Sequence, residues 1–385
     1  MCSISVDIRS SCPNIRSEWS DLLTRASNYN VFVSPDALNA VCRTKFTKVH
    51  VLLAWDDEAE PEQLVGVWAL GESKQGLAAP HVLTAPAYDY AFISDPVIDR
   101  RYYREVATAF VKAIKDDAYL PKTMRVSDLD RDNDFLSALT AAVAGEGGQC
   151  EYVAQAARPI KTTGPDCHQS KSTRKKLRQD WNRLCKLGAV ELHNDRSPPA
   201  VREAFEMFLS MENLSWKGEQ GTALLSKQHD VSFARQLVQN LAAVHGASVA
   251  VLRLDGKPIA AQVLLYCGST AFTWKIAYDR DYAKYSPGTV LVDQIGERIL
   301  SSGQAVALDS CSAETGFMGQ IWQERRSTVD LLMELRENRK IRFHCLTAMH
   351  RGYQRLRRLR REVFDSSPVR HMRKSAAKAG KKLGA

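Results

Sequence analysis

The stretch KIAYDRDYAKYSPGTVLVDQIGERIL (Lys275–Leu300) joins an apolar, aromatic run to an amphipathic helix pattern through a Ser-Pro-Gly. Ser286 stands where an N-cap belongs, and Pro287 suits the first helical position because it gives up an amide that would have no partner there. The next free donors are the backbone amides of Gly288, Thr289 and Val290. Such a helix start favours an anion through its oriented amides and the helix dipole. The tripeptide by itself is equally compatible with a helix start that binds nothing.

The surroundings of this helix start favour a binding site. Four apolar residues at helical spacing predict a face that packs on a sheet: Leu291, Val292, Ile295 and Ile299. The approach to the helix is crowded with polar and aromatic residues: Lys275, Tyr278, Asp279, Tyr282 and Tyr285. The helix also follows a predicted strand, and open α/β sheets usually bind ligands at the carboxyl ends of their strands.

The composition is that of a soluble globular protein. The chain has 385 residues, 44% hydrophobic and 25% charged, which predicts two domains. No apolar run approaches the roughly 20 residues needed to span a bilayer, and the start MCSISVDIRSSCP lacks the pattern of a secretory signal. Nine scattered cysteines without a C-x-x-C predict reduced thiols in a cytosolic protein. Nine histidines without an H-E-x-x-H pattern predict no metal site.

The net charge of +9 belongs to one end of the chain. From Arg336 onward there are 16 Lys and Arg against 3 Asp and Glu, so the remainder carries a net charge of −4. This end includes a basic amphipathic helix pattern over 336–365, which could lie on an anionic membrane face, bind a partner or pack on the second domain. Residues 366–385 have the composition of a disordered tail.

The first half alternates predicted helices and strands. The expected helices are Ser17–Ala26, Ser34–Lys45, Tyr102–Asp117 and Asp132–Ala144, and the expected strands are Val49–Trp55, Leu64–Glu72, Thr123–Leu129 and Glu151–Ala157. Ser34 is a suitable N-cap for the second helix, with Pro35 at its first position.

The second half repeats this order. The expected helices are Lys171–Gly188, with Gly188 as its C-cap, Pro199–Leu214, Ala234–Gly246 and Thr289–Leu300; the expected strands are 247–254, 257–266, 270–279, 305–311 and 327–335. Asp255-Gly256 is a strong hairpin signal between the first two strands. Both halves run helix, helix, β-hairpin, crossover helix, strand, so we expect a duplicated α/β unit. The expected division is a first domain over 1–157, a linker over 158–170 and a second domain over 171–335.

Four features together resemble a known superfamily: Trp216-Lys217-Gly218, the strand Phe272–Asp279, Ser286-Pro287-Gly288 and a late strand ending in Asp309. They look like the acyl-CoA N-acyltransferases of the GNAT superfamily, and most like the cellulose-biosynthesis-type (CelD/BcsL-like) branch, a relative of the FemAB-like double-GNAT proteins. The resemblance covers roughly Trp19–Leu335. It implies two tandem GNAT-like α/β domains with mixed central sheets flanked by helices, the first of them a degenerate copy.

The resemblance implies acetyl-CoA or another acyl-CoA as the co-substrate, with its pyrophosphate on the amides of the helix start. The implied cofactor-binding residues are Thr273, Lys275, Ile276, Ser286, Gly288, Thr289 and Val290. The usual GNAT signature Q/R-x-x-G-x-G/A does not occur here, since Ala283–Gly288 reads AKYSPG. Some Fem-type relatives use aminoacyl-tRNA in place of acyl-CoA.

Transfer to an amine requires a polarised carbonyl and a base that deprotonates the incoming ammonium. A backbone amide of the strand beside the cofactor, here Thr273–Tyr278, would polarise the carbonyl. The candidate bases are Glu212, Asp279 and Asp309, and Tyr285 could protonate the leaving thiolate. The residues expected to contact the acceptor are Trp216, Lys217, Tyr278 and Tyr282.

Three of these features also have purely structural interpretations. Trp216-Lys217-Gly218 could be a helix-ending turn with a packed tryptophan. Lys275, between apolar strand residues, could pair with Asp279 or Asp309 instead of contacting a ligand. The seven basic residues of the predicted helix Lys171–Gly188 could form a solvated face, or could bind CoA phosphates, an anionic polymer or tRNA.

The sequence therefore predicts an N-acyltransferase that moves an acyl group from acyl-CoA to an amine, on a sugar or polysaccharide precursor in cell-envelope biosynthesis. We expect it in the cytoplasm, where the basic helix could hold it at the inner face of the membrane or on a protein partner. Two alternatives remain: Fem-type aminoacyl transfer from charged tRNA, and a catalytically silent scaffold of a polysaccharide-synthesis complex.

Overall fold

One mixed sheet runs through the whole molecule. The computed structural model describes residues 3–74, 81–163, 170–337, 343–345, 347–349 and 351–352. In these residues the strands follow the order β1-β2-β3-β4-β6-β13-β7-β12-β11-β10-β9-β8, and β5 pairs with β3. The neighbours β4 and β6 are parallel, as are β11 and β12, whereas the other pairs are antiparallel. The predicted α/β class with a mixed sheet is confirmed.

The elements of the N-terminal half are β1 (Ile4–Arg9), α1 (Arg16–Arg25), η1 (Val31–Val33), α2 (Pro35–Arg43), β2 (Val49–Asp56), β3 (Gln63–Lys74), β4 (His81–Ala85), β5 (Val97–Ile98), α3 (Tyr103–Asp116), β6 (Thr123–Asp130), α4 (Asp134–Gly145) and β7 (Gln149–Thr162). The side chain of Ser34 accepts a hydrogen bond from the amide of Ala37, so the predicted N-cap of α2 is confirmed. The edge strand β1 was not predicted, although its short sequence ISVDIR alternates apolar and polar residues as a half-exposed strand does.

The elements of the C-terminal half are α5 (Lys171–Cys185), β8 (Val190–His193), α6 (Pro198–Asn213), α7 (Trp216–Glu219), η2 (Leu224–Ser226), α8 (Gln228–Ala243), β9 (Ala247–Leu254), β10 (Lys257–Cys267), β11 (Thr270–Tyr278), η3 (Arg280–Tyr285), α9 (Pro287–Ser301), β12 (Ala307–Asp309), α10 (Met318–Ile321) and β13 (Glu324–Glu334). The turn Asp255-Gly256 has positive φ at both residues, as the predicted hairpin requires. Gly188 is not the C-cap of α5, since that helix ends one turn earlier with Lys186 as its cap.

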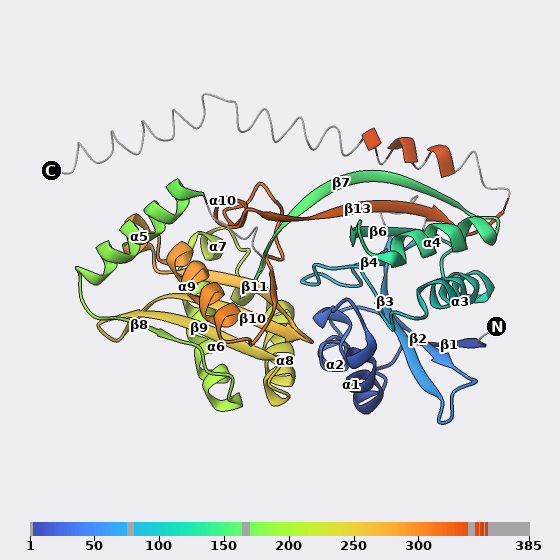
Figure 1. Cartoon of the computed structure of the whole chain (residues 1–385), viewed down its shortest axis with the longest axis horizontal. Coiled ribbons are helices and arrows are strands. Elements are labelled where there is room, and N and C mark those ends of the chain that lie inside the picture. Colours follow the sequence, from blue (N-terminus) through green and yellow to red (C-terminus); the bar gives the residue numbers. More distant parts are fainter. Residues whose placement is uncertain are drawn as a thin grey trace.

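The two halves repeat one order of elements and exchange their last strands. Helices α1 and α2, hairpin β2–β3, helix α3 and strand β6 correspond to α6 and α8, β9–β10, α9 and β12. The long strand β7 pairs with β12 of the other half, and β13 pairs with β6 of the first half. Figure 1 shows β7 and β13 side by side, arching from the N-terminal half toward the C-terminal half. The central β7–β13 ladder therefore ties the halves into one sheet.

This exchange corrects part of the expected domain division. Residues 158–162, expected to begin a linker over 158–170, belong to β7 and pair with β12 and β13. The last strand of the expected second domain pairs with β6 of the first. Residues 164–169 lie outside the described residues. The division at about residue 170 stays a prediction for the helices and the remaining strands.

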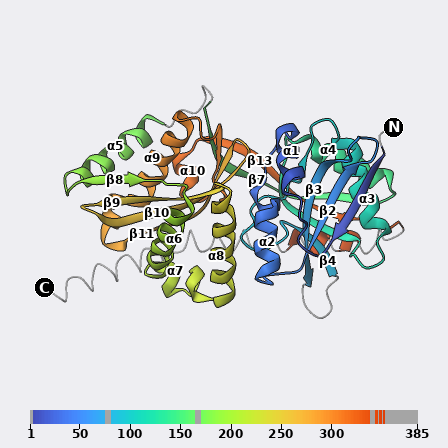
Figure 2. The same ribbon diagram turned by 90° about the horizontal axis from the view of Figure 1, so that it is seen from below.

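Helices cover both faces of the sheet, and one core joins the halves. In the C-terminal half α5 and α9 cover one face and α6 and α8 cover the other (Figure 2). Apolar side chains of α1 and α2 share a single buried cluster with those of α6 and α8. The remaining face of the N-terminal half is covered by α3 and α4. Burial of these faces is the main favourable term for the fold.

Part of the predicted C-terminal extension packs on the sheet. Residues 343–345, 347–349 and 351–352 are helical, and Phe343 and Thr347 are buried. Arg351 donates to Glu151 Oε2 on β7 at 2.8 Å. Met349, an apolar residue of the amphipathic helix expected over 336–365, is exposed. The rest of the expected helix over 336–365 and the tail over 366–385 lie largely outside the described residues, so their binding to a membrane or partner stays a prediction. Among the helices that the structure describes, none has the length and apolar character to cross a bilayer.

The turn between β10 and β11 should be sensitive to substitution because Tyr29 of the N-terminal half packs on it. Gly268 has φ +53°, and a Cβ there would lie 2.2 Å from Tyr29 Cε1. We expect Gly268→Ala to lower the free energy of unfolding by about 2–4 kcal/mol, from backbone strain and displacement of the ring. Denaturant unfolding measures this.

Gly256→Ala is the matched control for that substitution. Gly256 also has positive φ, at +78°, but a Cβ there meets nothing within 4 Å. Gly256→Ala should lower the free energy of unfolding only through backbone strain, by about 1 kcal/mol. Equal losses for the two variants would contradict a packing role for the contact between Tyr29 and Gly268.

Candidate active site

The sheet opens between β11 and β12. These parallel strands pair only at Thr270–Phe272 with Ala307–Asp309, after which β12 ends and β11 continues for six residues. Within the part of the chain that the structure describes, residues 273–278 of β11 therefore have no partner strand on this side. One carbonyl of this edge, that of Ile276, accepts from Lys217 Nζ at 3.2 Å. The opening leaves backbone groups of the strand free for a ligand, as expected for the strand that polarises the acyl carbonyl.

A cavity of about 160 Å³ lies at this opening. It is lined by Lys217, Gln262, Thr273, Trp274, Lys275, Ile276, Ser310, Cys311, Ser312, Phe317 and Met318. The structure thus brings four of the predicted residues to one place: Thr273, Lys275, Ile276 and Lys217. The sequence reasoning missed Gln262, whose signal was a polar residue within the apolar strand KPIAAQVLLYC.

Gln262 is the polar group of this cavity that lacks a protein partner. Its side chain is 1% exposed, and its Oε1 has no hydrogen bond among the described residues. Leaving a buried acceptor unpaired costs about 1–3 kcal/mol. Such groups in native structures call for an explanation, and a ligand that donates a hydrogen bond is one. The cavity therefore fits a group with at least one N–H or O–H.

A β-bulge shapes the strand at the cavity. The β10–β11 register shifts so that Val263 pairs with Lys275 and Leu264 with Thr273, which leaves Trp274 as the extra residue. The bulge brings both Trp274 and Lys275 against Tyr90 of the N-terminal half, with Lys275 Nζ 4.5 Å from the centre of the Tyr90 ring.

Lys275 makes no ion pair with either of the carboxylates proposed for it. Asp279 pairs with Lys257 at 2.8 Å, and Asp309 pairs with two arginines, so the structural interpretation of Lys275 is wrong. The pKa of Lys275 is lowered to about 8, chiefly by burial and in smaller part by the nearby Lys217, whereas Glu212 and Asp230 oppose the shift. A lysine with this pKa is partly neutral near physiological pH and can accept a proton.

Glu212 is buried and fully engaged, which argues against its predicted role as a base. It is 0% exposed; its Oε1 accepts from Lys217 Nζ at 2.9 Å, and its Oε2 accepts from the amide of Leu224 at 2.9 Å. Glu212 therefore fixes Lys217 against the Ile276 carbonyl and holds the loop after α7. Trp216 on α7 is 47% exposed, so the turn does not contain the packed tryptophan of its structural interpretation.

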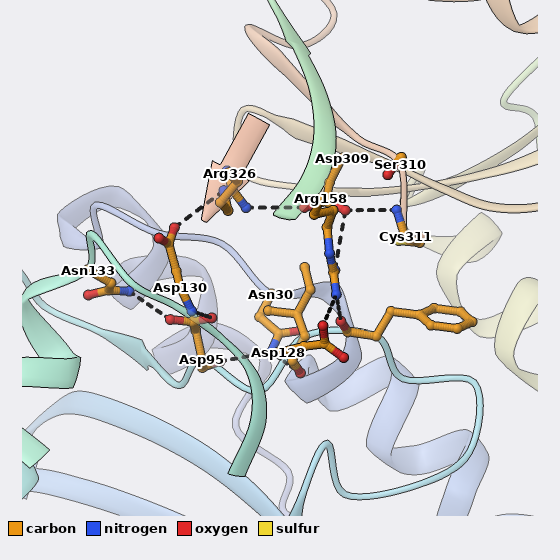
Figure 3. A network of polar contacts seen from close by, with 12 residues as sticks. Asn30, Asp95, Asp128, Asp130, Asn133, Arg158, Asp309, Ser310, Cys311 and Arg326 are labelled. Carbon is orange, nitrogen blue, oxygen red and sulfur yellow. Dashed lines mark hydrogen bonds and ion pairs between the residues drawn. The ribbon is translucent and has the colours of Figure 1, made fainter. Parts of the chain in front are cut away.

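Asp309, the third candidate base, is the centre of a structural network (Figure 3). It is 0% exposed and pairs with Arg158 of β7 at 3.4 Å and Arg326 of β13 at 3.2 Å. Its Oδ1 also accepts from the amide of Cys311 at 2.8 Å. Arg326 continues the network to Asp130 at 3.3 Å. This network argues against the predicted role of Asp309 as a base, because both of its carboxylate oxygens already accept from protein donors.

The network ends at a buried carboxyl in the N-terminal half. Asp95 accepts from the amide of Asp130 at 3.1 Å and from Asn133 Nδ2 at 3.0 Å. Burial, and then the charge of Asp130, raise the pKa of Asp95 to about 7. Figure 3 shows this carboxyl beside Asp130, away from Asp309. Asp95 lies where the two halves join. It lines neither the cavity beside Gln262 nor the groove along α6 that is described below.

The start of α9 differs in detail from the prediction. Ser286 occupies the N-cap position in the left-handed region, at φ 53°, and its side chain makes no capping hydrogen bond. Its carbonyl accepts from the amide of Val290 at 3.0 Å, so Val290 is not a free donor. Within the described residues, the amides of Gly288 and Thr289 have no acceptor. The predicted anion cradle is therefore reduced from three amides to two.

Gly288 lets α9 approach β11 closely. It is buried, and a Cβ there would lie 3.3 Å from Tyr278 Cδ1 and 3.5 Å from Ile276 Cδ1. Because Ile276 lines the small cavity, the helix start and the cavity share one stretch of β11. Thr289, the next donor, is only partly buried.

Basic and aromatic side chains surround the approach to α9. The Arg183 guanidinium of α5 lies 5.1 Å from the centre of the Tyr285 ring, and Lys284 Nζ lies 5.0 Å from it. Lys257 Nζ lies 5.0 Å from the Tyr282 ring. Helix α5 packs against α9 and η3, so its basic residues lie on the same side of the sheet as the helix start. The proton-donor role of Tyr285 stays a prediction.

A larger groove of about 1040 Å³ lies between α6 and the residues that follow β11. Its apolar lining includes Met207, Met211, Leu214, Pro258 and Tyr278, and its charged lining includes Arg202, Glu203 and Arg280. Tyr278 is thus near the start of α9 and also lines the groove. Tyr282 lies beside the groove, above Lys257. Among the described residues no cluster of His, Cys, Asp or Glu could hold a metal ion.

Asp309→Ala should destabilise the protein strongly. The substitution leaves Arg158, a buried guanidinium, without one of its carboxylates, and frees the Cys311 amide. We expect a loss of about 3–5 kcal/mol in the free energy of unfolding. Denaturant unfolding measures it, with Asp279→Ala as the control that removes a partly exposed ion pair and the N-cap of η3 and should cost only about 1 kcal/mol. Equal stability of the two variants would restore Asp309 as a candidate base.

Lys275→Met should stabilise the protein while damaging the site. Between pH 8 and 10.5 the unfolded chain holds more protons at Lys275 than the folded protein does, so wild-type stability rises with pH in this window. Below pH 8 the cost of the buried charge is fully present. The methionine removes it, and we expect the free energy of unfolding at pH 7 to rise by about 1–3 kcal/mol.

The measurement for Lys275→Met is denaturant unfolding from pH 6 to 10, with Lys257→Met as the control at an exposed lysine. The gain of Lys275→Met over wild type should shrink as the pH rises above 8. A gain that is independent of pH would contradict a buried charge at this position.

Comparison with known proteins agrees with the fold and with part of the site. A family model described as an acetyltransferase (GNAT) domain matches residues 171–311, which include β11, the start of α9 and β12. FemX has a similar structure over 85% of this chain and 96% of its own, at 10% identity and a TM-score of 0.60. No curated protein sequence matches the chain.

Two further structures share the fold. L-PGS from Bacillus licheniformis is similar over 89% of this chain and 98% of its own, at 14% identity and a TM-score of 0.52. The C-terminal domain of a putative lysylphosphatidylglycerol synthetase from Agrobacterium fabrum is similar over 82% and 90%, at 13% identity and a TM-score of 0.52. Residues 171–311 thus match a GNAT domain, and the α/β fold extends over both halves. The cellulose-biosynthesis-type branch stays a prediction.

Proposed function

We propose that the chain is an acyltransferase that moves an acyl group from acyl-CoA to an amine at the opening between β11 and β12. The observation that carries this is the position of two unpaired amides, those of Gly288 and Thr289, at the end of an unpaired strand edge. The amides suit the pyrophosphate of the donor. The strand edge and the cavity beside it suit the pantetheine amides and the acyl group.

The residues of the cavity fit such a donor. The orphaned Oε1 of Gln262 would accept a hydrogen bond from a donor amide or from the acceptor amine. The free backbone groups of β11 lie where the acyl carbonyl would be polarised. When bound, acyl-CoA supplies an activated acyl group and a thiolate leaving group.

Lys275 is our candidate for the base. In its neutral form it accepts a proton from the ammonium of the acceptor, and the amine then attacks the acyl carbonyl. As the C–S bond breaks, the thiolate takes a proton, for which Tyr285 is the candidate donor, and the second proton lost by the amide nitrogen restores Tyr285. Lys275 returns its proton to solvent, so one amine is acylated and one thiol is released. With Glu212 and Asp309 committed to protein partners, Lys275 replaces them in this role.

We propose the α6 groove as the acceptor site. Tyr278 lines this groove, and Ile276, two residues earlier on the same face of β11, lines the small cavity, so the two sites adjoin along the strand. The predicted acceptor residues Tyr278 and Tyr282 lie at this groove, whereas Lys217 lines the small cavity and Trp216 is exposed near it. The acceptor class, a sugar or polysaccharide precursor, and a cytoplasmic location are proposals that rest on the resemblance.

One observation keeps aminoacyl transfer from charged tRNA as a second candidate. Helix α5, with six basic residues and one acidic residue, flanks the start of α9, where an RNA backbone could be bound. The structural similarity to FemX is compatible with this candidate. A silent scaffold is less favoured, because open space remains beside Ile276 and Tyr278.

The proposal is tested by calorimetric titration of CoA and acetyl-CoA into wild-type protein and into Thr289→Glu. Thr289 is partly exposed and lies in the first turn of α9, where a carboxylate is tolerated by the helix. The added charge should repel the pyrophosphate and weaken binding by at least about tenfold. Gly288 is less suitable, since it is buried against Tyr278.

Thr289→Gln is the matched control, with a side chain of the same size and no charge. It should bind both ligands nearly as wild type does. Binding that is equal in Thr289→Glu and Thr289→Gln would contradict the phosphate cradle. If neither ligand binds wild-type protein, charged tRNA is titrated next, and binding that weakens steeply with salt would support the second candidate.

A further inference from the structure

Tyr90 reaches from the N-terminal half into the candidate site of the C-terminal half. It lies in the segment between β4 and β5 and makes three contacts with the other half. Its ring faces Lys275 Nζ at 4.5 Å, its hydroxyl donates to Asp230 Oδ2 at 2.7 Å, and its carbonyl accepts from Trp274 Nε1 at 3.0 Å. The hydroxyl, the carbonyl and the ring of Tyr90 thus each contact α8 or β11.

The backbone of Tyr90 is held in an unfavourable conformation. Its φ is +75°, in the region that a bulky non-glycine residue rarely adopts. Such outliers persist when the surroundings fix them, and they gather at functional sites. Here Phe233 and Phe46 stack beside the ring, with centroids at 6.2 Å and 5.9 Å. This backbone conformation places the face of the Tyr90 ring over the Lys275 amine.

We infer that Tyr90 is a positioning residue of the reaction, and that the N-terminal half thereby completes the site of the C-terminal half. Its ring lies over the Lys275 amine, and Lys275 lines the cavity at the opening between β11 and β12 whereas Tyr90 does not. This inference rests on the proposed function, in which Lys275 takes a proton from the acceptor. It also gives the N-terminal half a role in the chemistry without a ligand site of its own.

The ring acts on Lys275 in two opposite ways. It shields the amine from water, which favours the neutral form, and its π face attracts the ammonium, which favours the charged form. The other groups that face the amine are Glu212 of α6, Lys217 of α7 and Asp230 of α8. Burial by all the surrounding groups is the largest effect on the amine and lowers the pKa of Lys275 to about 8 from its ordinary value of 10.5; we expect the Tyr90 ring to contribute to this burial.

The test measures the pH midpoint at which Lys275 reacts with acetic anhydride, by competitive labelling and mass spectrometry, in wild type, Tyr90→Phe and Tyr90→Ala. Phenylalanine keeps the ring, so its midpoint should stay within a few tenths of a pH unit of wild type. Alanine admits water, so its midpoint should rise by at least about one unit. The exposed Lys257 is the internal control and should not change in any variant.

A midpoint of Lys275 that is the same in Tyr90→Ala as in wild type would overturn the inference. If Tyr90→Ala does not fold, Tyr90→Leu replaces it. Leucine covers the amine without a π face, so the midpoint should fall by a few tenths to about one pH unit. A midpoint unchanged in Tyr90→Leu would also overturn the inference.

Titration of acetyl-CoA into the same variants separates this inference from the proposed function. Tyr90 lies away from the start of α9, so Tyr90→Phe and Tyr90→Ala should bind acetyl-CoA as wild type does. Loss of binding in both variants would overturn the positioning role, since Tyr90 would then support the donor site itself. A Tyr90-dependent midpoint in a wild-type protein that binds no CoA would support the positioning role while refuting the donor proposal.

Discussion

The candidate site depends on where strand β12 ends. Asp309 is its last residue, and the carboxylate of Asp309 accepts the amide of Cys311, which turns the chain at φ 49° away from β11. Arg158 of β7 and Arg326 of β13 neutralise this buried charge from the two exchanged strands. Because the ladder stops there, the last six residues of β11 keep a free edge. The ion-pair network that joins the halves therefore also opens the sheet where a ligand can bind.

This dependence explains why the halves must be one unit. A carboxylate buried at the end of β12 is tolerated only if it is paired, and both of its partners come from strands that cross between the halves. The same join brings the segment around Tyr90 against β11 and α8. A GNAT-like sheet alone, residues 171–335, contains Asp309 and Arg326 but lacks Arg158 and Tyr90. The N-terminal half thus contributes to the geometry of the site, whatever its own ancestry.

Much of the fold could be predicted from periodicity and turn chemistry, because those signals are local. Ser34-Pro35 and Asp255-Gly256 did start a helix and turn a hairpin. The strand exchange could not be predicted, since the expected strands Glu151–Ala157 and 327–335 carry no information about their partners. The predicted residues Thr273, Lys275 and Ile276 do line one cavity, but the sequence did not show what each residue of the site does. Glu212 and Asp309 are carboxylates near the opening, but only the structure shows that each is buried among donors. Gln262 of β10 and Tyr90 of the N-terminal half lie outside the stretch Lys275–Leu300 in sequence. Only the fold brings their side chains to β11.

The opening also constrains what the site can accept. A cavity of about 160 Å³ has room for several water molecules, or for an acyl group of a few heavy atoms. A long acyl chain would need space outside this cavity, and the groove along α6 has an apolar lining. The orphaned acceptor of Gln262 opposes filling the cavity with hydrocarbon alone, because the group would remain buried and unpaired. A small acyl group carried on an amide-containing arm, or one that carries its own amine, satisfies both the volume and this acceptor.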